Sequence, residues 1–289
     1  MYIALHPFFD PEKTQLKYSR TELVSSFQEI KHPIFREVLK LLNVKGVDIN
    51  SIADIPSGTG LGSSSSFTVG VLNTLYTYLG RSITAEELAA QACDIEINKL
   101  GEPIGKQDQY AAACGGLNFI TFNSDDTVNV EKLKVSENKL QELQENLIMI
   151  YTGDTRSAST ILSEQKNSLD HEAKFNNVKE MTVLARNLKG SLNANDIDAV
   201  GTAMHEGWQI KRSLVGSISS TLIDDLYAKG RNAGALGGKL LGAGGGGFLL
   251  FYCKKEKQAA LSRAMKGFRA FPVAFDTHGS KVVYNDDIR

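Results

Sequence analysis

Hydrophobic positions along the chain follow two periods, and the balance between them changes near residue 150. In the first half, Ile34, Val38, Leu41 and Leu42 recur at helical spacing, which predicts a helix. Residues 64–79 carry apolar side chains on most faces and predict a buried helix. Strands are expected at residues 3–5, 15–18, 48–52, 117–122, 128–133 and 147–151, the first two as a hairpin.

Two more helices are expected before residue 150. Thr84 and Glu87 form a capping-box pattern, which predicts the start of a helix that runs to about Leu100. Residues 107–114 are mostly small and predict a short helix after a loop.

Long polar helices dominate the second half of the chain. They are expected at residues 155–168, 172–190, 195–213, 219–233 and 254–267. A glycine-rich strand pair is expected over residues 237–252, with short strands at 271–275 and 281–284. Because helices and strands mix without strict alternation, the pattern favours an α+β fold over a doubly wound parallel sheet. A domain boundary is expected near residue 150.

Composition narrows the functional classes. The 289 residues are 42% hydrophobic and 22% charged, which is ordinary for a soluble globular protein. The 32 Lys and Arg nearly balance the 33 Asp and Glu, so no general attraction to nucleic acid or to an anionic membrane is expected. An anionic ligand would need a local cluster of positive groups.

Motifs for export, disulfides and transition metals are not found in the sequence. No apolar run reaches membrane-spanning length, and the N-terminus lacks a basic segment followed by an apolar one. Cys93, Cys114 and Cys253 form no CxxC pair, and the five histidines show no HExxH spacing. These features fit a protein of the reducing cytoplasm.

The strongest local signal is a glycine- and serine-rich loop at residues 56–66. Gly58, Gly60 and Gly62 stand at alternate positions and let the backbone approach a ligand closely. The serines that follow open an apolar helix, whose N-terminal amides and partial positive charge can hold phosphate without a lysine. The expected phosphate contacts are Pro56, Gly58, Thr59, Gly60, Leu61, Gly62, Ser63, Ser64 and Ser65.

Two familiar phosphate loops fail on spacing. The Walker pattern needs a lysine directly after its last glycine, but Ser63 follows Gly62. The dinucleotide-binding pattern GxGxxG would need a third glycine where Ser63 stands. The competing structural interpretation is a tight strand-to-helix turn capped by a serine, although such a turn needs only one or two residues of this kind.

The loop resembles the second signature motif of the GHMP kinases, which include galactokinase, homoserine kinase and the mevalonate kinases. Residues 239–247, Lys-Leu-Leu-Gly-Ala-Gly-Gly-Gly-Gly, resemble their third motif and stand in the family's order. Within the family, residues 18–22, 105–110, 152–158 and 205–212 resemble the D-glycero-D-manno-heptose-7-phosphate kinases. The similarity runs essentially from Tyr2 to the end.

This resemblance implies the two-domain α+β fold of the GHMP kinases. Residues 1–150 would form an ATP-binding α/β domain like ribosomal protein S5 domain 2, and residues 151–289 a ferredoxin-like α+β domain. The family normally begins with a further basic, glycine-rich strand that bears its first motif and helps to hold the sugar. This chain starts at Met1 inside what resembles the next strand, so that segment is expected to be absent.

The resemblance also implies catalytic and metal-binding residues. Asp108 matches the galactokinase aspartate that acts on the acceptor hydroxyl and is expected to be the general base. A helix N-cap is the alternative role for Asp108. Glu96 matches a Mg²⁺-holding carboxylate, and Ser64 would add a hydroxyl ligand. The alternative for Glu96 is a solvated position on a helix face.

Further residues complete the predicted catalytic and nucleotide-binding set. Lys106 could neutralise phosphate or could simply be exposed. Arg156 opens a helix, where a cation is unfavourable unless it has an anionic partner. Gly244 to Gly246 are expected to back the phosphate loop, with Gly244 and Gly245 in contact with the nucleotide. The alternative for these glycines is a tight turn that allows close helix packing.

The segment 205–212 leaves two interpretations open. Lys211 and Arg212 stand near a predicted helix C-terminus, so substrate contact and surface placement are both plausible. Trp208 is expected in the core rather than as a stacking platform for a sugar.

The resemblance implies a kinase that uses ATP and Mg²⁺ on a sugar or sugar phosphate. The expected reaction is phosphorylation of D-glycero-D-manno-heptose 7-phosphate at its anomeric hydroxyl, in the synthesis of nucleotide-activated heptose. Alternatives are a galactose or fucose kinase, or a relative that binds nucleotide without turnover. No nucleic acid or membrane partner is expected, and the oligomeric state is left open, a homodimer included.

Overall fold

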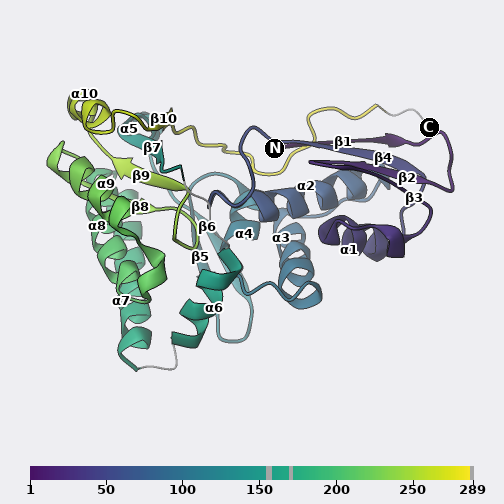
Figure 1. Ribbon diagram of the computed structural model, residues 1–289, viewed down its shortest axis with the longest axis horizontal. Helices are drawn as coiled ribbons and strands as arrows, with labels where there is room; N and C mark the ends of the chain where they lie inside the picture. Colours follow the sequence, from purple (N-terminus) through teal and green to yellow (C-terminus); the bar gives the residue numbers. More distant parts are fainter. Residues whose placement is uncertain (154–157, 169–171, 287–289) are drawn as a thin grey trace.

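The computed structural model describes residues 1–153, 158–168 and 172–286 (Figure 1). Two four-stranded sheets lie towards opposite ends of the molecule, with a two-stranded hairpin between them. The strands are β1 (Tyr2–Pro7), β2 (Thr14–Lys17), β3 (Thr21–Val24), β4 (Val47–Ile52), β5 (Asn118–Phe122), β6 (Val128–Lys132), β7 (Leu147–Tyr151), β8 (Gly237–Leu240), β9 (Phe248–Tyr252) and β10 (Arg269–Pro272).

Helices account for most of the remaining described residues. The α-helices are α1 (Pro33–Leu42), α2 (Ser63–Tyr78), α3 (Ala85–Cys93), α4 (Gln107–Cys114), α5 (Glu137–Asn146), α6 (Ala158–Ser168), α7 (Glu172–Asn193), α8 (Asp198–Arg212), α9 (Thr221–Asn232) and α10 (Lys255–Ala264). Shorter elements are η1 (Phe27–Glu29), the π-helical η2 (Asp94–Lys99) and η3 (Gly216–Ile218). None of the helices described is both long and apolar enough to cross a bilayer.

The first sheet has the strand order β1-β4-β2-β3. β4 pairs antiparallel with β1 and parallel with β2, so the expected hairpin between residues 3–5 and 15–18 is wrong. The first half of β4 is buried at Val47, Asp48 and Ile49. This burial fits a strand that lies between β1 and β2.

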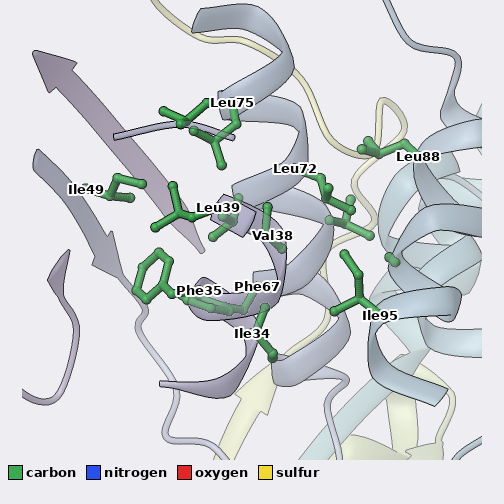
Figure 2. Packing of buried hydrophobic residues seen from close by; sticks show 14 of the residues in the cluster. Ile34, Phe35, Val38, Leu39, Ile49, Phe67, Leu72, Leu75, Leu88 and Ile95 are labelled. Atoms are coloured by element: carbon green, nitrogen blue, oxygen red, sulfur yellow. The ribbon is translucent and has the colours of Figure 1, made fainter. Parts of the chain in front are cut away.

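Helices α1 and α2 cover one face of this sheet, and their apolar side chains form the first core (Figure 2). Phe35, Leu39, Ile49 and Leu72 are fully buried there. The buried faces of α2 confirm the prediction of a core helix over residues 64–79.

A buried carboxylate ties β3 to the start of α1. Glu22 accepts hydrogen bonds from the Tyr18 hydroxyl at 2.7 Å and from the amides of Lys31 and His32 at 2.7 and 3.1 Å. These bonds satisfy the carboxylate, and they hold its pKa below the usual range against the effect of burial. The segment 18–22 therefore has a clear structural role.

The second sheet is antiparallel throughout, in the order β10-β7-β9-β8. Its core joins Ile150, Leu249 and Phe251 to side chains from α8 and α9. Trp208 of α8 is 1% exposed, as expected for a core residue. This sheet begins at Leu147, although the domain boundary near residue 150 stays a prediction.

The structure departs from the predicted elements at further places, and β3 is one strand that was not predicted. α5 was not predicted, because Leu140 and Leu143 are the only apolar residues in its polar sequence. The helix that begins after Thr84 changes into the π-helical η2 at Asp94. Residues 281–284 are exposed and form no strand.

The chain after β10 returns to the first half of the molecule. The amide of Gly116 donates to the carbonyl of Asp276 at 2.6 Å, and Asn73 of α2 donates to the hydroxyl of Ser280 at 2.9 Å. This segment therefore links the two sheets at a place separate from the loops described below.

Close packing of β8 against α8 generates a test of the fold. A Cβ atom added at Gly237 would lie 1.8 Å from the carbonyl oxygen of Gly201. Gly237→Ala should therefore lower the free energy of unfolding by about 1–3 kcal/mol. Gly190, on an exposed position of α7, has no atom within 4 Å of an added Cβ. Gly190→Ala should raise stability by about 0.5–1 kcal/mol. Urea unfolding of both variants checks the pair, and equal effects would contradict it.

Candidate active site

Three glycines determine the backbone conformation of the loop between β4 and α2. Gly58, Gly60 and Gly62 have φ values of +79°, +81° and +63°, a region that disfavours side chains. A Cβ at Gly60 would lie 2.6 Å from the carbonyl oxygen of Leu241, and one at Gly62 would lie 3.4 Å from the carboxylate of Asp108. The glycines thus let the loop approach both the C-terminal half and α4.

Main-chain N–H groups at the start of α2 find no acceptor in the part of the chain that the structure describes. The N-cap residue is Gly62, so no side chain caps the helix. The first helical hydrogen bond runs from the amide of Ser66 to the carbonyl of Gly62 at 2.9 Å. Among the residues described, none accepts a hydrogen bond from the amides of residues 57–65. The alternative of a serine-capped turn is therefore wrong, and the N–H groups of a 16-residue helix point to an anion site.

The expected loop residues have different surroundings. Thr59 is 1% exposed, and its hydroxyl donates to the carbonyl of Pro56 at 3.0 Å, which fixes the turn. Ser65 is buried, whereas Ser64 is exposed. Leu61 and Ser63 are half-buried.

A second glycine loop, between β8 and β9, packs directly on the first. A Cβ at Gly242 would lie 2.5 Å from the Cα of Gly60, and one at Gly247 would lie 2.2 Å from the carbonyl oxygen of Thr59. Gly247 is also anchored to Thr152 at the end of β7, whose hydroxyl donates to its carbonyl at 3.0 Å and can accept from its amide at 3.1 Å. Two backbones therefore touch where side chains would hold them apart.

The flanking glycines of this second loop make these contacts, rather than the predicted central pair. Gly244 packs against the backbone of Ile218, and the amide of Gly245 donates to the Ile218 carbonyl at 2.9 Å. The Gly245 amide therefore already has an acceptor within the protein. The nucleotide contact of Gly244 and Gly245 is not tested by this geometry and stays a prediction.

Glu96 lies in the π-helical η2 and is 1% exposed, which rules out a solvated helix face. Its two carboxylate oxygens accept hydrogen bonds from the Ser64 hydroxyl and from the Gln109 side-chain amide, the latter at 2.7 Å. Gln109 is fully buried, and its own Oε1 has no hydrogen-bond partner among the described residues. The structure thus brings Ser64 and Glu96 together, as a shared metal site would require.

Asp108 is the second residue of α4, where Lys106 holds the N-cap position. The alternative role of Asp108 as the N-cap is therefore wrong. Desolvation by the surrounding protein raises the pKa of Asp108, against the opposing charges of Lys239 and Lys211. The side chain keeps access to solvent, so this desolvation is partial. A carboxylate with a raised pKa is a stronger base near neutral pH.

Two lysines of the second half lie close enough to affect Asp108. Lys211, at the end of α8, donates to the carbonyl of Gly242. Burial, together with the charge of Lys239, lowers the pKa of Lys211 to about 8. Burial also lowers the pKa of Lys239 on β8, against the attraction of Asp108.

The remaining predicted cations lie elsewhere. Lys106 forms an ion pair with Asp126 in the β5–β6 turn at 2.8 Å. Arg212 pairs with Asp224 of α9 at 3.0 Å, which supports its surface placement. Arg156 falls outside the described residues.

Three residues of the site were not predicted from sequence. No role was assigned to Lys239, which appeared only as the first residue of the glycine motif, or to Gln109 and Thr152, which appeared only within the family-like segments 105–110 and 152–158. Their spacing carried no signal, because each depends on which way a side chain points in the folded chain.

Comparison with known proteins agrees with this geometry. Residues 17–116 match the N-terminal domain of the GHMP kinases, and residues 188–269 match the GHMP kinase C-terminal domain. A D-glycero-alpha-D-manno-heptose 7-phosphate kinase from Campylobacter jejuni is 30% identical over 240 residues, covering 82% of this chain and 71% of the relative. An Arabidopsis thaliana bifunctional fucokinase/GDP-fucose pyrophosphorylase is 28% identical over 222 residues, or 74% of this chain and 20% of that protein.

A solved structure shares the fold. The D-glycero-D-manno-heptose 1-phosphate kinase of Bacteroides thetaiotaomicron matches with a TM-score of 0.72 and 23% identity, over 96% of this chain and 84% of the other. The fold and the open amide loop thus define a small-molecule kinase, an ATP-dependent phosphotransferase with an alcohol group as acceptor. The chain belongs to the GHMP kinase family, and the expected two-domain α+β fold is confirmed.

Asp108 provides the first test of the site. Asp108→Asn should lower kcat by about 10²–10⁴-fold, because the amide cannot accept the proton of the acceptor hydroxyl. ATP affinity should stay unchanged. Since partial desolvation raises the pKa of Asp108, wild-type activity should fall on the acidic side at a higher pH than an ordinary aspartate would give. Coupled ADP-release assays across pH check this, with exposed Asp225→Asn as the control. Lost ATP affinity with retained turnover would contradict the base role.

Proposed function

We propose that this kinase phosphorylates the anomeric hydroxyl of D-glycero-D-manno-heptose 7-phosphate, giving the 1,7-bisphosphate and ADP in the synthesis of nucleotide-activated heptose. The phosphoryl transfer rests on one observation, the partner-free amides of residues 57–65 beside Asp108. The choice of sugar rests on 30% identity to the Campylobacter jejuni heptose 7-phosphate kinase.

The arrangement supports a transfer in which the protein supplies position and charge. The amides of residues 57–65 hold the phosphates of ATP at the N-terminus of α2. Asp108 contacts the loop at Gly62, so an acceptor hydroxyl at its carboxylate faces the terminal phosphate. Asp108 takes the hydroxyl proton while the acceptor oxygen bonds to phosphorus and ADP leaves.

Ser64 and Glu96 are the residues that would hold Mg²⁺. A hydroxyl and a carboxylate are hard oxygen donors, and Mg²⁺ commonly takes few protein ligands besides phosphates and water. Within residues 1–153, 158–168 and 172–286, no group of three or more His, Cys, Asp or Glu is placed to hold a metal. The hydroxyl of Ser64 and the carboxylate of Glu96 fit a metal that arrives with ATP, and such a metal would neutralise phosphate charge. Gln109 keeps the Glu96 carboxylate oriented.

The metal role of Glu96 can be tested by titration. Glu96→Gln removes the charge but keeps the shape, and it should raise the Mg²⁺ concentration for half-maximal ADP release by at least about tenfold. Exposed Glu256→Gln on α10 serves as the matched control. An unchanged Mg²⁺ requirement in a folded Glu96→Gln protein would remove Glu96 from the metal site.

A panel of acceptors tests the sugar. ADP release should be measured with heptose 7-phosphate, heptose 1-phosphate, unphosphorylated heptose, galactose and fucose. The heptose 7-phosphate should give a kcat/KM at least about 10²-fold above galactose and fucose, a difference of about 2.7 kcal/mol. Fucose is included because of the similarity to the Arabidopsis fucokinase. Preference for fucose or galactose would refute the heptose assignment, and tight ATP binding without turnover would favour a non-catalytic relative.

A further inference from the structure

Three charged side chains from distant parts of the sequence meet beside the phosphate loop. Asp108 contributes from α4, Lys211 from α8 and Lys239 from β8. Lys211 donates to the carbonyl of Gly242, and Gly242 packs on Gly60 of the phosphate loop. The contact between the two glycine loops therefore delivers both lysines to the loop that Asp108 touches at Gly62.

The charges of this trio do not balance. Asp108 is the one carboxylate, among the described residues, whose charge acts on either lysine. Two lysines thus share one carboxylate in partly desolvated surroundings, where like charges without a partner are costly. Lys106 and Arg212, in contrast, each have a carboxylate partner of their own. The excess positive charge is suited to an additional anion.

The position of the trio identifies which anion it would bind. The acceptor oxygen lies at Asp108 and forms its new bond to the terminal phosphorus of ATP. Lys211 is hydrogen-bonded to the glycine loop that packs on Gly60, and Lys239 lies on the strand that leads into that loop, so both lysines lie at the end of the site where this phosphorus would be held. The phosphate on the far carbon of a heptose 7-phosphate lies several bonds away from this point.

We propose that Lys211 and Lys239 are catalytic residues that bind the oxygens of the phosphoryl group during its transfer. This inference rests on the transfer reaction proposed above, but not on the identity of the sugar. The hydroxyl proton passes to Asp108, the bond from acceptor oxygen to phosphorus forms, and the bond from phosphorus to the oxygen of ADP breaks. Both lysines stay protonated and stabilise the charge that this exchange spreads over the phosphoryl oxygens.

Kinetics of lysine variants test the proposal. Lys211→Met and Lys239→Met should each lower kcat by about 10²–10³-fold, the scale for one lost donor to a transition state. The KM of the acceptor should change by less than about threefold. Exposed Lys229→Met on α9 is the matched control, and melting temperatures verify folding. A raised KM limited to phosphorylated acceptors, with kcat intact, would assign the lysines to the sugar phosphate and overturn the proposal.

The pH dependence of kcat/KM separates the effect of the Lys211 charge from the effect of its side-chain shape. Lys211 has a pKa of about 8 and is protonated below it, with Lys239 and Asp108 as the charged groups that face it. Wild-type kcat/KM, which reports the free enzyme, should therefore fall as pH rises through about 8. Lys211→Arg keeps its charge to much higher pH and should move this alkaline limb upward. An unmoved limb would contradict the role of the Lys211 charge.

A binding measurement tests the lysines independently of any sugar. ADP with Mg²⁺ and aluminium fluoride mimics the phosphoryl group in transfer, and wild type should bind this combination more tightly than ADP with Mg²⁺ alone. Both methionine variants should keep the ADP affinity but lose at least about tenfold of the added affinity, since a tenfold loss is about 1.4 kcal/mol. If the variants match wild type, the inference fails even where a sugar is turned over. If they lose the added affinity while no sugar reacts, only the acceptor assignment fails.

Discussion

Contact between two glycine loops is the constraint on which the site depends. Gly60 meets Gly242, and the carbonyl of Thr59 meets Gly247, at distances where a Cβ atom could not fit. This backbone contact joins the end of the first sheet to the hairpin turn of the second. It sets where the N-terminus of α2 lies relative to the lysines of the second half, and larger residues in either loop would separate the two halves of the chemistry.

The site obtains its positive charge without a lysine in the phosphate loop. Main-chain amides and the α2 helix dipole provide the fixed part of the field, and they need no side-chain ordering when an anion binds. The side-chain cations come from the opposite half of the chain. Desolvation lowers the pKa of Lys211 and raises the pKa of Asp108. Asp108 would thus serve as the base and Lys211 would stabilise charge. The same surroundings raise the pKa of the first and lower that of the second.

Local patterns in the sequence predicted most of the elements and the two loops, because glycine conformations, caps and hydrophobic periods are local properties. The buried helix over residues 64–79 and the meeting of Ser64 with Glu96 could be foreseen, the first from periodicity and the second from family resemblance. The pairing of the strands could not be foreseen. β4 lies between β1 and β2, which were expected to pair as a hairpin, and its position depends on the three-dimensional core. The direction in which the Lys239 side chain points could not be predicted either, because it depends on the packing of β8 rather than on the residues next to it in sequence.

The central claim is that the amides of residues 57–65 are the triphosphate site. A crystal structure with Mg²⁺ and a non-hydrolysable ATP analogue tests this most directly. The account predicts phosphate oxygens about 2.7–3.2 Å from several of these nitrogens, with Asp108 facing the terminal phosphate. Phosphates bound elsewhere, while the same amides turn inward to carbonyl groups of the protein itself, would contradict it.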